Sequence, residues 1–123
     1  LCKEIERSSA VYRELPFVFQ RDSHVIHGVI DLLYRAPDGT WTVVDYKTDR
    51  VEDDKLELHA RAYYLQMAVY AEAVAAHAGK VPRVMLVFLH HPNLPIVLKP
   101  ADLRAELDKV PLKTLIEMLR EDT

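Results

Sequence analysis

The sequence predicts an α/β fold, a central mixed β-sheet flanked by helices in the order β-β-β-α-β-α-α. Three observations lead to this prediction. The N-terminal part alternates apolar and polar residues in short segments, as strands do, and a long segment rich in alanine and leucine favours helix. A short, continuously apolar run follows, which is typical of a buried strand. An α+β description would fit the same order of elements.

Three segments in the N-terminal part predict strands. Residues 14–20 form the first, and Pro16 places it at a sheet edge or at the start of a strand. Residues 24–34 form the second, because they alternate and include β-branched side chains, and residues 41–48 form the third. The segment Pro37-Asp38-Gly39-Thr40 joins the last two as a turn, since proline presets φ and glycine supplies a positive φ. We therefore expect a meander.

Helix and strand signals place the remaining elements. A helix is expected from about Leu56 to Ala78, and Gly79 is positioned to end it. The apolar run at 84–89 predicts a fourth strand, which Pro92 and Pro95 terminate. The C-terminal part predicts two further helices, one beginning at Pro100 or Ala101 and one from Leu112 to Arg120.

Length and composition indicate a single globular domain over residues 1–123. Hydrophobic residues make up 50% of the chain and charged residues 28%, which is ordinary for such a domain. No apolar run approaches the roughly 18–20 residues that span a bilayer, and charges interrupt any signal-peptide pattern. We therefore expect no membrane contact and a cytoplasmic location. Because the chain lacks an initiating methionine, we also expect an excised piece of a longer protein.

Two aspartates and a lysine are the most informative residues. Asp31 ends the segment Gly28-Val29-Ile30-Asp31, and Asp45 and Lys47 lie on the third predicted strand, where alternation points both to the same face. Pairing across the turn brings Asp31 roughly opposite Asp45, with Cβ atoms ~5 Å apart. Charges on an apolar strand are costly to bury unless they are paired or bind a metal. The patch therefore predicts a metal site.

Such a patch suits metal-dependent phosphodiester hydrolysis. Mg²⁺ and Mn²⁺ prefer oxygen ligands, which Asp31, Asp45 and the main-chain carbonyl of Tyr46 could supply. A bound metal lowers the pKa of water and neutralises transition-state charge, while Lys47 could steer the attacking water. The net charge of −3 argues against tight DNA binding by this chain alone, so metal ions or another domain would supply positive charge.

A less specific interpretation competes with this one. An Asp-x-Lys triplet also suits a solvated, ion-paired strand end, and a second triplet, Asp53-Asp54-Lys55, lies in a polar connection. The long helix adds evidence, because Tyr63, Gln66 and Tyr70 fall on one face at i, i+3 and i+7. The tyrosines could simply face the core, but glutamine is less expected there. Its amide could hold a metal-bound water or a nucleic-acid backbone.

Together these motifs resemble the RecB-like branch of the PD-(D/E)xK nucleases, and most of all the nuclease domain at the C-terminus of AddA/RecB-type helicase–nucleases. The resemblance runs from about residue 12 to residue 90. It is carried by four motifs in order: Glu14-Leu15-Pro16-Phe17, Gly28-Val29-Ile30-Asp31, Val44-Asp45-Tyr46-Lys47-Thr48-Asp49 and Tyr63-x-x-Gln66-x-x-x-Tyr70. It implies a restriction-endonuclease-like fold.

The resemblance also implies residue roles and a reaction. The implied roles are metal ligands for Asp31 and Asp45, catalytic lysine for Lys47, accessory helix residues for Tyr63, Gln66 and Tyr70, and an acid beside the site for Glu14. The implied activity is Mg²⁺- or Mn²⁺-dependent cleavage of DNA, usually as an exonuclease, in bacterial double-strand-break processing. The implied partners are DNA, helicase domains of the same parent chain and a second subunit.

Two departures from the family pattern qualify these implications. Relatives place a histidine ligand on a helix before the first strand, whereas residues 1–10 can hold only the tail of that helix, so we expect an incomplete metal shell. Some relatives carry an iron–sulfur cluster, but no cysteine follows Cys2, so none is expected. Two rival hypotheses are a nuclease fold kept as a non-catalytic DNA-binding or docking module, and a structural domain whose acids form surface ion pairs.

Overall fold

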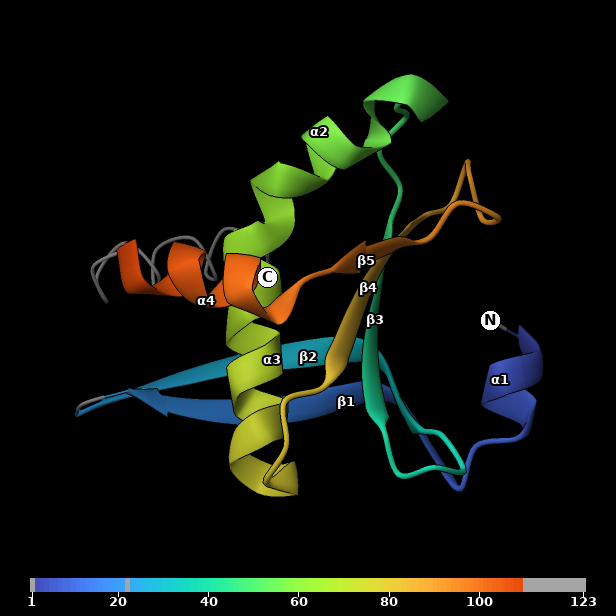
Figure 1. Cartoon of the computed structure of the whole chain (residues 1–123). Helices are drawn as coiled ribbons and strands as arrows, with labels where there is room; N and C mark the ends of the chain where they lie inside the picture. The colour runs from blue at the N-terminus through green and yellow to red at the C-terminus, as the bar shows by residue number, and fades with distance from the viewer. Residues whose placement is uncertain (1, 22, 110–123) are drawn as a thin grey trace.

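The computed structural model describes residues 2–21 and 23–109, which form a five-stranded sheet with helices on both faces (Figure 1). The strands are β1 (Ala10–Arg21), β2 (His24–Arg35), β3 (Trp41–Lys47), β4 (Arg83–Phe88) and β5 (Ile96–Leu98). The helices are α1 (Cys2–Glu6), α2 (Leu56–Ala60), α3 (Tyr64–Ala78) and α4 (Pro100–Lys109), with 3₁₀ turns η1 (Asp53–Lys55) and η2 (Arg61–Tyr63). The helix predicted at 112–120 lies outside the described residues. None of the described helices is long and apolar enough to cross a membrane.

The order of strands in the sheet is β1-β2-β3-β4-β5. The first three strands form the predicted antiparallel meander. Strand β4 then pairs with β3 in parallel, and β5 pairs with β4 antiparallel, so the predicted mixed sheet is confirmed. Parallel neighbours need a crossover connection, and the segment from η1 to α3 supplies it.

Alternation along β3 divides the core between the two faces of the sheet. Val43 belongs to the larger hydrophobic cluster, to which α2, α3 and α4 contribute, whereas Val44 belongs to a smaller cluster on the opposite face. Ile5 of α1 packs against the smaller cluster, and Figure 1 shows α1 and α3 on different sides of β3. Because Asp45 and Lys47 share the Val43 side, β3 delivers them to the face that α3 covers.

The helix predicted from Leu56 to Ala78 is interrupted. Helix α2 passes into the 3₁₀ turn η2 before α3 begins, and α3 ends at Gly79, whose φ is 75°. The sequence of the interruption holds no proline or glycine, so helix propensity does not explain it. It coincides instead with polar contacts of Tyr63, which are described below.

Other boundaries also differ from the prediction. Strand β1 begins at Ala10 rather than at residue 14, because residues 10–13 pair with β2 but lack an alternating apolar pattern. Strand β5 was not predicted, since it is a three-residue strand directly after Pro95 and too short to show a period. The five-residue helix α1 was likewise missing from the predicted order of elements. None of these differences moves the candidate site residues.

The pairing of β1 with β2 is interrupted at Glu14 and Asp31, and the alternation of side chains between the two faces of the sheet shifts there. Pairs on either side keep one register, but these two residues are not paired, and Glu14 has a φ of 49° in the left-handed region. Ile30 belongs to the larger core cluster and Leu32 to the smaller one, although residues two apart on a regular strand share a face. The irregularity places Asp31 where β2 crosses from one face to the other.

Candidate active site

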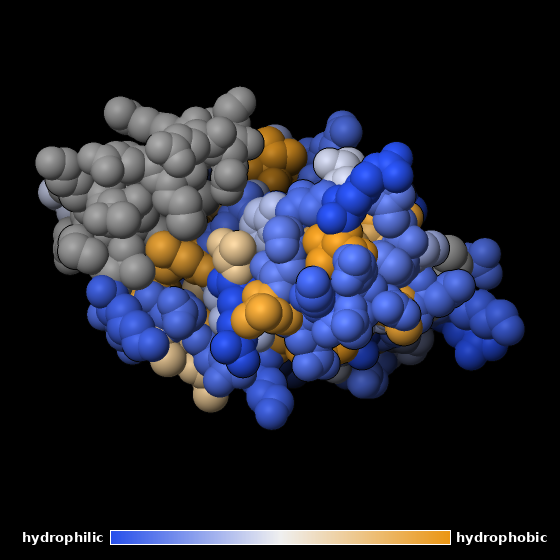
Figure 2. Space-filling model, turned by 90° about the horizontal axis from the view of Figure 1, so that it is seen from above, coloured by the Kyte–Doolittle hydropathy of each residue, from blue (hydrophilic) through white to orange (hydrophobic). Residues whose placement is uncertain are grey.

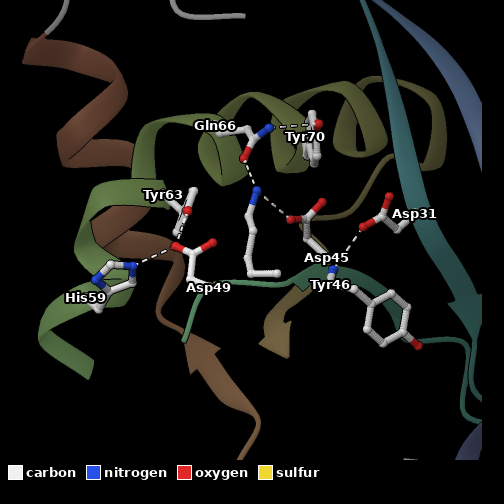
Figure 3. A network of polar contacts seen from close by, with 9 residues as sticks. Asp31, Asp45, Tyr46, Asp49, His59, Tyr63, Gln66 and Tyr70 are labelled. Atoms are coloured by element: carbon white, nitrogen blue, oxygen red, sulfur yellow. Dashed lines mark hydrogen bonds and ion pairs between the residues drawn. The ribbon is translucent and has the colours of Figure 1, made fainter. Parts of the chain in front are cut away.

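The end of β3 presents Asp45 and Lys47 to the helical face. Asp45 is 4% exposed, and Lys47 Nζ lies 2.9 Å from its Oδ2 atom. The same Nζ donates a hydrogen bond to Gln66 Oε1 at 2.8 Å and lies 4.1 Å from the centre of the Tyr63 ring. Figure 3 shows Asp45, Gln66 and Tyr63 converging from β3 and from the helical segment. The lysine is therefore held by a carboxylate, an amide and an aromatic face.

Asp31 reaches the same place from β2. The last pair of the β2–β3 ladder is Leu32 with Val44, so Asp31 and Asp45 are the next residues along both strands. Asp31 Oδ2 accepts a hydrogen bond from the Tyr46 main-chain N–H at 2.9 Å. Figure 3 shows Asp31 beside Asp45. The juxtaposition expected from the turn and from strand alternation is present.

The accessory residues lie behind Lys47. Gln66 is buried on α3, and its Nε2 atom donates to the Tyr70 hydroxyl at 3.2 Å. The Tyr70 ring meets the ring of Phe17 on β1 edge-on, with centroids 5.1 Å apart. Tyr63 comes from η2 rather than from α3. The predicted stripe thus connects β1 to Lys47 through a ring contact and two hydrogen bonds.

The electrostatics of the site centre on Asp45. Burial, with a smaller contribution from the neighbouring Asp31 carboxylate, raises the pKa of Asp45 to about 6 against the opposing charge of Lys47. The ion pair with Lys47 lacks the directional geometry of a hydrogen bond. Asp45 Oδ2 is therefore a buried carboxylate oxygen held by the charge of Lys47, with no other donor among residues 2–21 and 23–109. A carboxylate oxygen accepts more than one contact, so Oδ2 could bind a metal cation in addition to Lys47.

The donor set fits a hard divalent cation. The carboxylates of Asp31 and Asp45 lie side by side. The N–H and C=O groups of one strand residue point to the same edge, so Tyr46, whose N–H reaches Asp31, also directs its carbonyl toward that edge. In the part of the chain that the structure describes, no three histidine, cysteine, aspartate or glutamate side chains group as a metal site. This chain would therefore supply a partial set of oxygen ligands, which waters and a substrate phosphate can complete.

Glu14 lies apart from these contacts. Its side chain is exposed, and its backbone occupies the gap in β1 that corresponds to Asp31 in β2. Its assignment as an acid beside the site stays a prediction.

A second polar cluster adjoins Lys47 and consists of Asp49, His59 and Tyr63; we call it the Asp49 cluster. Asp49 Oδ2 accepts a hydrogen bond from the Tyr63 hydroxyl at 2.5 Å and lies 2.7 Å from His59 Nε2. The hydrogen bonds from Tyr63 and His59 hold the pKa of Asp49 below its usual range. The sequence indicated Tyr63 but not the roles of Asp49 and His59. The spacing Asp45-x-Lys47-x-Asp49 was the available signal for a third acid.

A separate cavity of about 860 Å³ opens between the β1–β2 hairpin and the C-terminal half of α3. Its lining is mostly apolar and includes Phe17, Trp41 and Val74, but neither aspartate of the site nor Lys47. Chemistry rather than cavity size therefore identifies the candidate active site.

Known proteins resemble this chain in a consistent way. Each of the three relatives described next bears the name of a component of an ATP-dependent helicase/nuclease. The protein of Thermoanaerobacter sp. (strain X514) is 29% identical over 82 residues, covering 67% of this chain and 7% of the relative. The protein of Carboxydothermus hydrogenoformans is 34% identical over 107 residues, covering 76% of this chain and 9% of the relative. The protein of Staphylococcus carnosus is 36% identical over 104 residues, covering 69% of this chain and 8% of the relative. The chain thus spans less than a tenth of the length of these relatives.

The family assignment rests on a broader match. The model of the PD-(D/E)XK nuclease superfamily matches residues 3–122, nearly the whole chain. The five-stranded mixed sheet with its flanking helices is consistent with the restriction-endonuclease-like α/β fold that the motifs implied. The chain therefore belongs to the PD-(D/E)XK nuclease superfamily.

Proposed function

We propose that this domain is a metal-dependent DNA nuclease, acting as an exonuclease within an ATP-dependent helicase–nuclease that processes double-strand breaks. The observation that carries the proposal is the buried carboxylate of Asp45, which lies beside Asp31 and forms an ion pair with Lys47 on the same face. A purely structural surface pair would not bury one carboxylate beside a second one, because burying neighbouring like charges costs stability. This argues against a structural domain whose acids form surface ion pairs.

In the proposed reaction, Asp31, Asp45 and the Tyr46 carbonyl would hold Mg²⁺ or Mn²⁺. The bound cation would activate a water molecule and neutralise charge on the phosphate. Lys47 would place its ammonium group near the attacking water and the scissile phosphate, with Gln66 fixing its orientation by the hydrogen bond to Nζ. Tyr70 would in turn hold Gln66 through its hydroxyl group.

The names of the relatives support DNA as the substrate, and the surface suits a polar substrate. The end of the molecule where β3 stops and α2 lies is mostly hydrophilic, with hydrophobic residues in separate small patches (Figure 2). Hydrophilic residues include acids as well as bases, so this surface suits a polar substrate without selecting DNA. The relatives named helicase/nuclease suggest that this domain is accompanied by helicase domains of the same chain and by a second subunit. Those parts could also supply the basic surface that a net charge of −3 does not.

The test is degradation of linear single- and double-stranded DNA with Mg²⁺ or Mn²⁺, comparing the wild-type chain with Lys47→Ala and Asp45→Ala. We expect each substitution to lower cleavage by at least ~100-fold, because each removes a group that acts on transition-state charge. The second Asp-x-Lys triplet supplies matched controls, since Asp53→Ala and Lys55→Ala change exposed residues of the same types.

Cleavage that persists in Asp45→Ala would contradict the proposal. If the wild-type chain cleaves nothing, the assay is repeated with a longer version that includes the sequence upstream of residue 1. Inactivity there, together with unchanged melting on addition of Mn²⁺, would favour a non-catalytic binding or docking module.

A further inference from the structure

We propose that Asp49 is a positioning residue for Lys47, acting through the ring of Tyr63, and that His59 holds Asp49 in place. The inference rests on the proposed function, in which Lys47 assists catalysis. It assigns a purpose to the Asp49 cluster, which lies next to the proposed metal ligands without being one of them.

The first step is the contact between the lysine and the ring. Lys47 Nζ lies 4.1 Å from the centre of the Tyr63 ring, within the range of a cation–π interaction. The carboxylate of Asp45 and the amide of Gln66 hold the same ammonium group from other directions. A lysine ammonium on a flexible stem has no fixed direction of its own, so its position depends on these neighbours.

The second step is what fixes the ring. Tyr63 belongs to the 3₁₀ turn that interrupts the helical segment, and its hydroxyl donates to Asp49 Oδ2. A carboxylate acceptor also pushes electron density into the phenol, which strengthens the attraction between the ring face and a cation. Asp49 therefore affects both the place and the charge distribution of the surface on which Lys47 rests.

The third step is the anchor of Asp49 itself. His59 on α2 lies 2.7 Å from the same Oδ2 atom, and its ring contacts the rings of Tyr63 and Phe88 with centroids 6.1 and 5.8 Å apart. Figure 3 shows Asp49, His59 and Tyr63 on one side of the site and Asp31 on the other. The side chains of His59 and Asp49 are 41% and 30% exposed, so the pair contributes little to the hydrophobic core. Positioning explains this arrangement better than stabilisation does.

The test combines a spectroscopic readout with kinetics. Lys47 ε-methylene protons above an aromatic face resonate upfield, so NMR of the metal-free chain in EDTA reports the contact directly. We expect Asp49→Ala and Tyr63→Phe to move this resonance toward the value of a free lysine, and Asp49→Asn, which keeps an acceptor oxygen, to retain more of the shift. Asp53→Ala is the matched control and should leave the resonance unchanged.

The kinetic arm uses whichever version of the protein cleaves DNA. Asp49→Ala should lower kcat by about 10- to 100-fold with little change in KM, because a misplaced catalytic group affects the transition state rather than substrate binding. His59→Ala should act in the same direction. The double variant Asp49→Ala/Tyr63→Phe should be no slower than Tyr63→Phe alone, since both changes break one chain of contacts.

The two proposals fail in different ways. An unchanged Lys47 resonance in both Asp49→Ala and Tyr63→Phe would overturn the positioning role, whatever the activity. The other outcome is that Asp49→Ala and Tyr63→Phe lose the upfield shift of Lys47, while Lys47→Ala cleaves DNA as well as wild type does. That result would overturn the proposed nuclease mechanism and leave the positioning role intact. Tyr63→Phe keeps the ring, so it remains informative even if Asp49→Ala fails to fold.

Discussion

Burial of the Asp45 carboxylate lowers the stability of the fold when the carboxylate is charged. This carboxylate is buried, and its pKa is raised to about 6 in spite of the ion pair with Lys47. The folded-state pKa thus lies above the unfolded value of about 4. Protonated Asp45 consequently stabilises the fold at low pH, and this contribution is lost as the pH rises through about 6. A shift of roughly 2 pKa units corresponds to at most about 3 kcal/mol.

We therefore expect Asp45→Asn to stabilise the metal-free chain at alkaline pH. The free energy of unfolding should rise on the order of 1–3 kcal/mol at pH 8 in EDTA and change little at pH 4, where wild-type Asp45 is already protonated. Urea unfolding at both pH values measures this, with the exposed Asp53→Asn as control, expected within about 0.5 kcal/mol of wild type. A variant less stable than wild type at pH 8 would refute the expectation.

Glu14 gives a second prediction at the scale of single residues. Its φ of 49° is unfavourable for a side-chain-bearing residue, whereas glycine adopts it without steric cost. We expect Glu14→Gly to be neutral or stabilising by up to about 1 kcal/mol, and Arg13→Gly, one residue earlier on the same exposed strand, to be destabilising by roughly 0.5–1 kcal/mol. Thermal melting compares them. If Glu14 also serves the site, Glu14→Gly will lose cleavage without losing stability, and equal destabilisation by both variants would contradict the argument.

At the scale of elements, β1, β2 and α3 meet at Gly28. A Cβ atom added there would lie 2.4 Å from the ring of Phe17, which is buried and packs against Tyr70. The ring would have to move, and Tyr70 holds Gln66. We expect Gly28→Ala to destabilise the fold by about 1–3 kcal/mol through overpacking and to weaken the Gln66–Lys47 contact.

Urea unfolding and DNA cleavage together measure the effect of Gly28→Ala. The neighbouring Val29→Ala changes an exposed side chain of the same strand, so its unfolding free energy should stay within roughly 0.5 kcal/mol of wild type. Wild-type stability in Gly28→Ala would mean that Phe17 has room to relax.

The elements that the sequence predicted are those whose side chains repeat with a clear period. Strands β2, β3 and β4 show alternation or a continuous apolar run, and strand geometry then brings Asp31 opposite Asp45 without further information. The 3₁₀ turn at Tyr63 has no local signal in the sequence, and it coincides with a hydrogen bond to Asp49, 14 residues away. The shift in side-chain alternation at Glu14 and Asp31 also has no signal in the sequence, since it involves backbone geometry rather than residue type.

At the scale of the whole molecule, the two faces of the sheet have separate roles. The α3 face holds the candidate active site, whereas Arg83 joins α1, β2 and β3 on the other face. Its Nε donates to Thr42 Oγ1 at 3.2 Å, and a guanidinium nitrogen donates to the Tyr34 hydroxyl at 2.9 Å and to Glu4 at 2.5 Å. Thr42 and Tyr34 are both fully buried, so Arg83 satisfies polar groups that water cannot reach.

This separation predicts that stability and cleavage respond independently. Arg83→Leu should lower the free energy of unfolding by about 1–3 kcal/mol, because it leaves buried hydroxyl groups with fewer partners and releases α1. Arg104→Leu is the matched control: it breaks an ion pair with Glu72 whose arginine is 59% exposed, so its cost should stay below about 1 kcal/mol. Cleavage per folded molecule should match wild type in both variants at a temperature well below melting. Reduced kcat in fully folded Arg83→Leu would show that the α1 face controls the site through the sheet, and the two faces would then have to be treated as one unit.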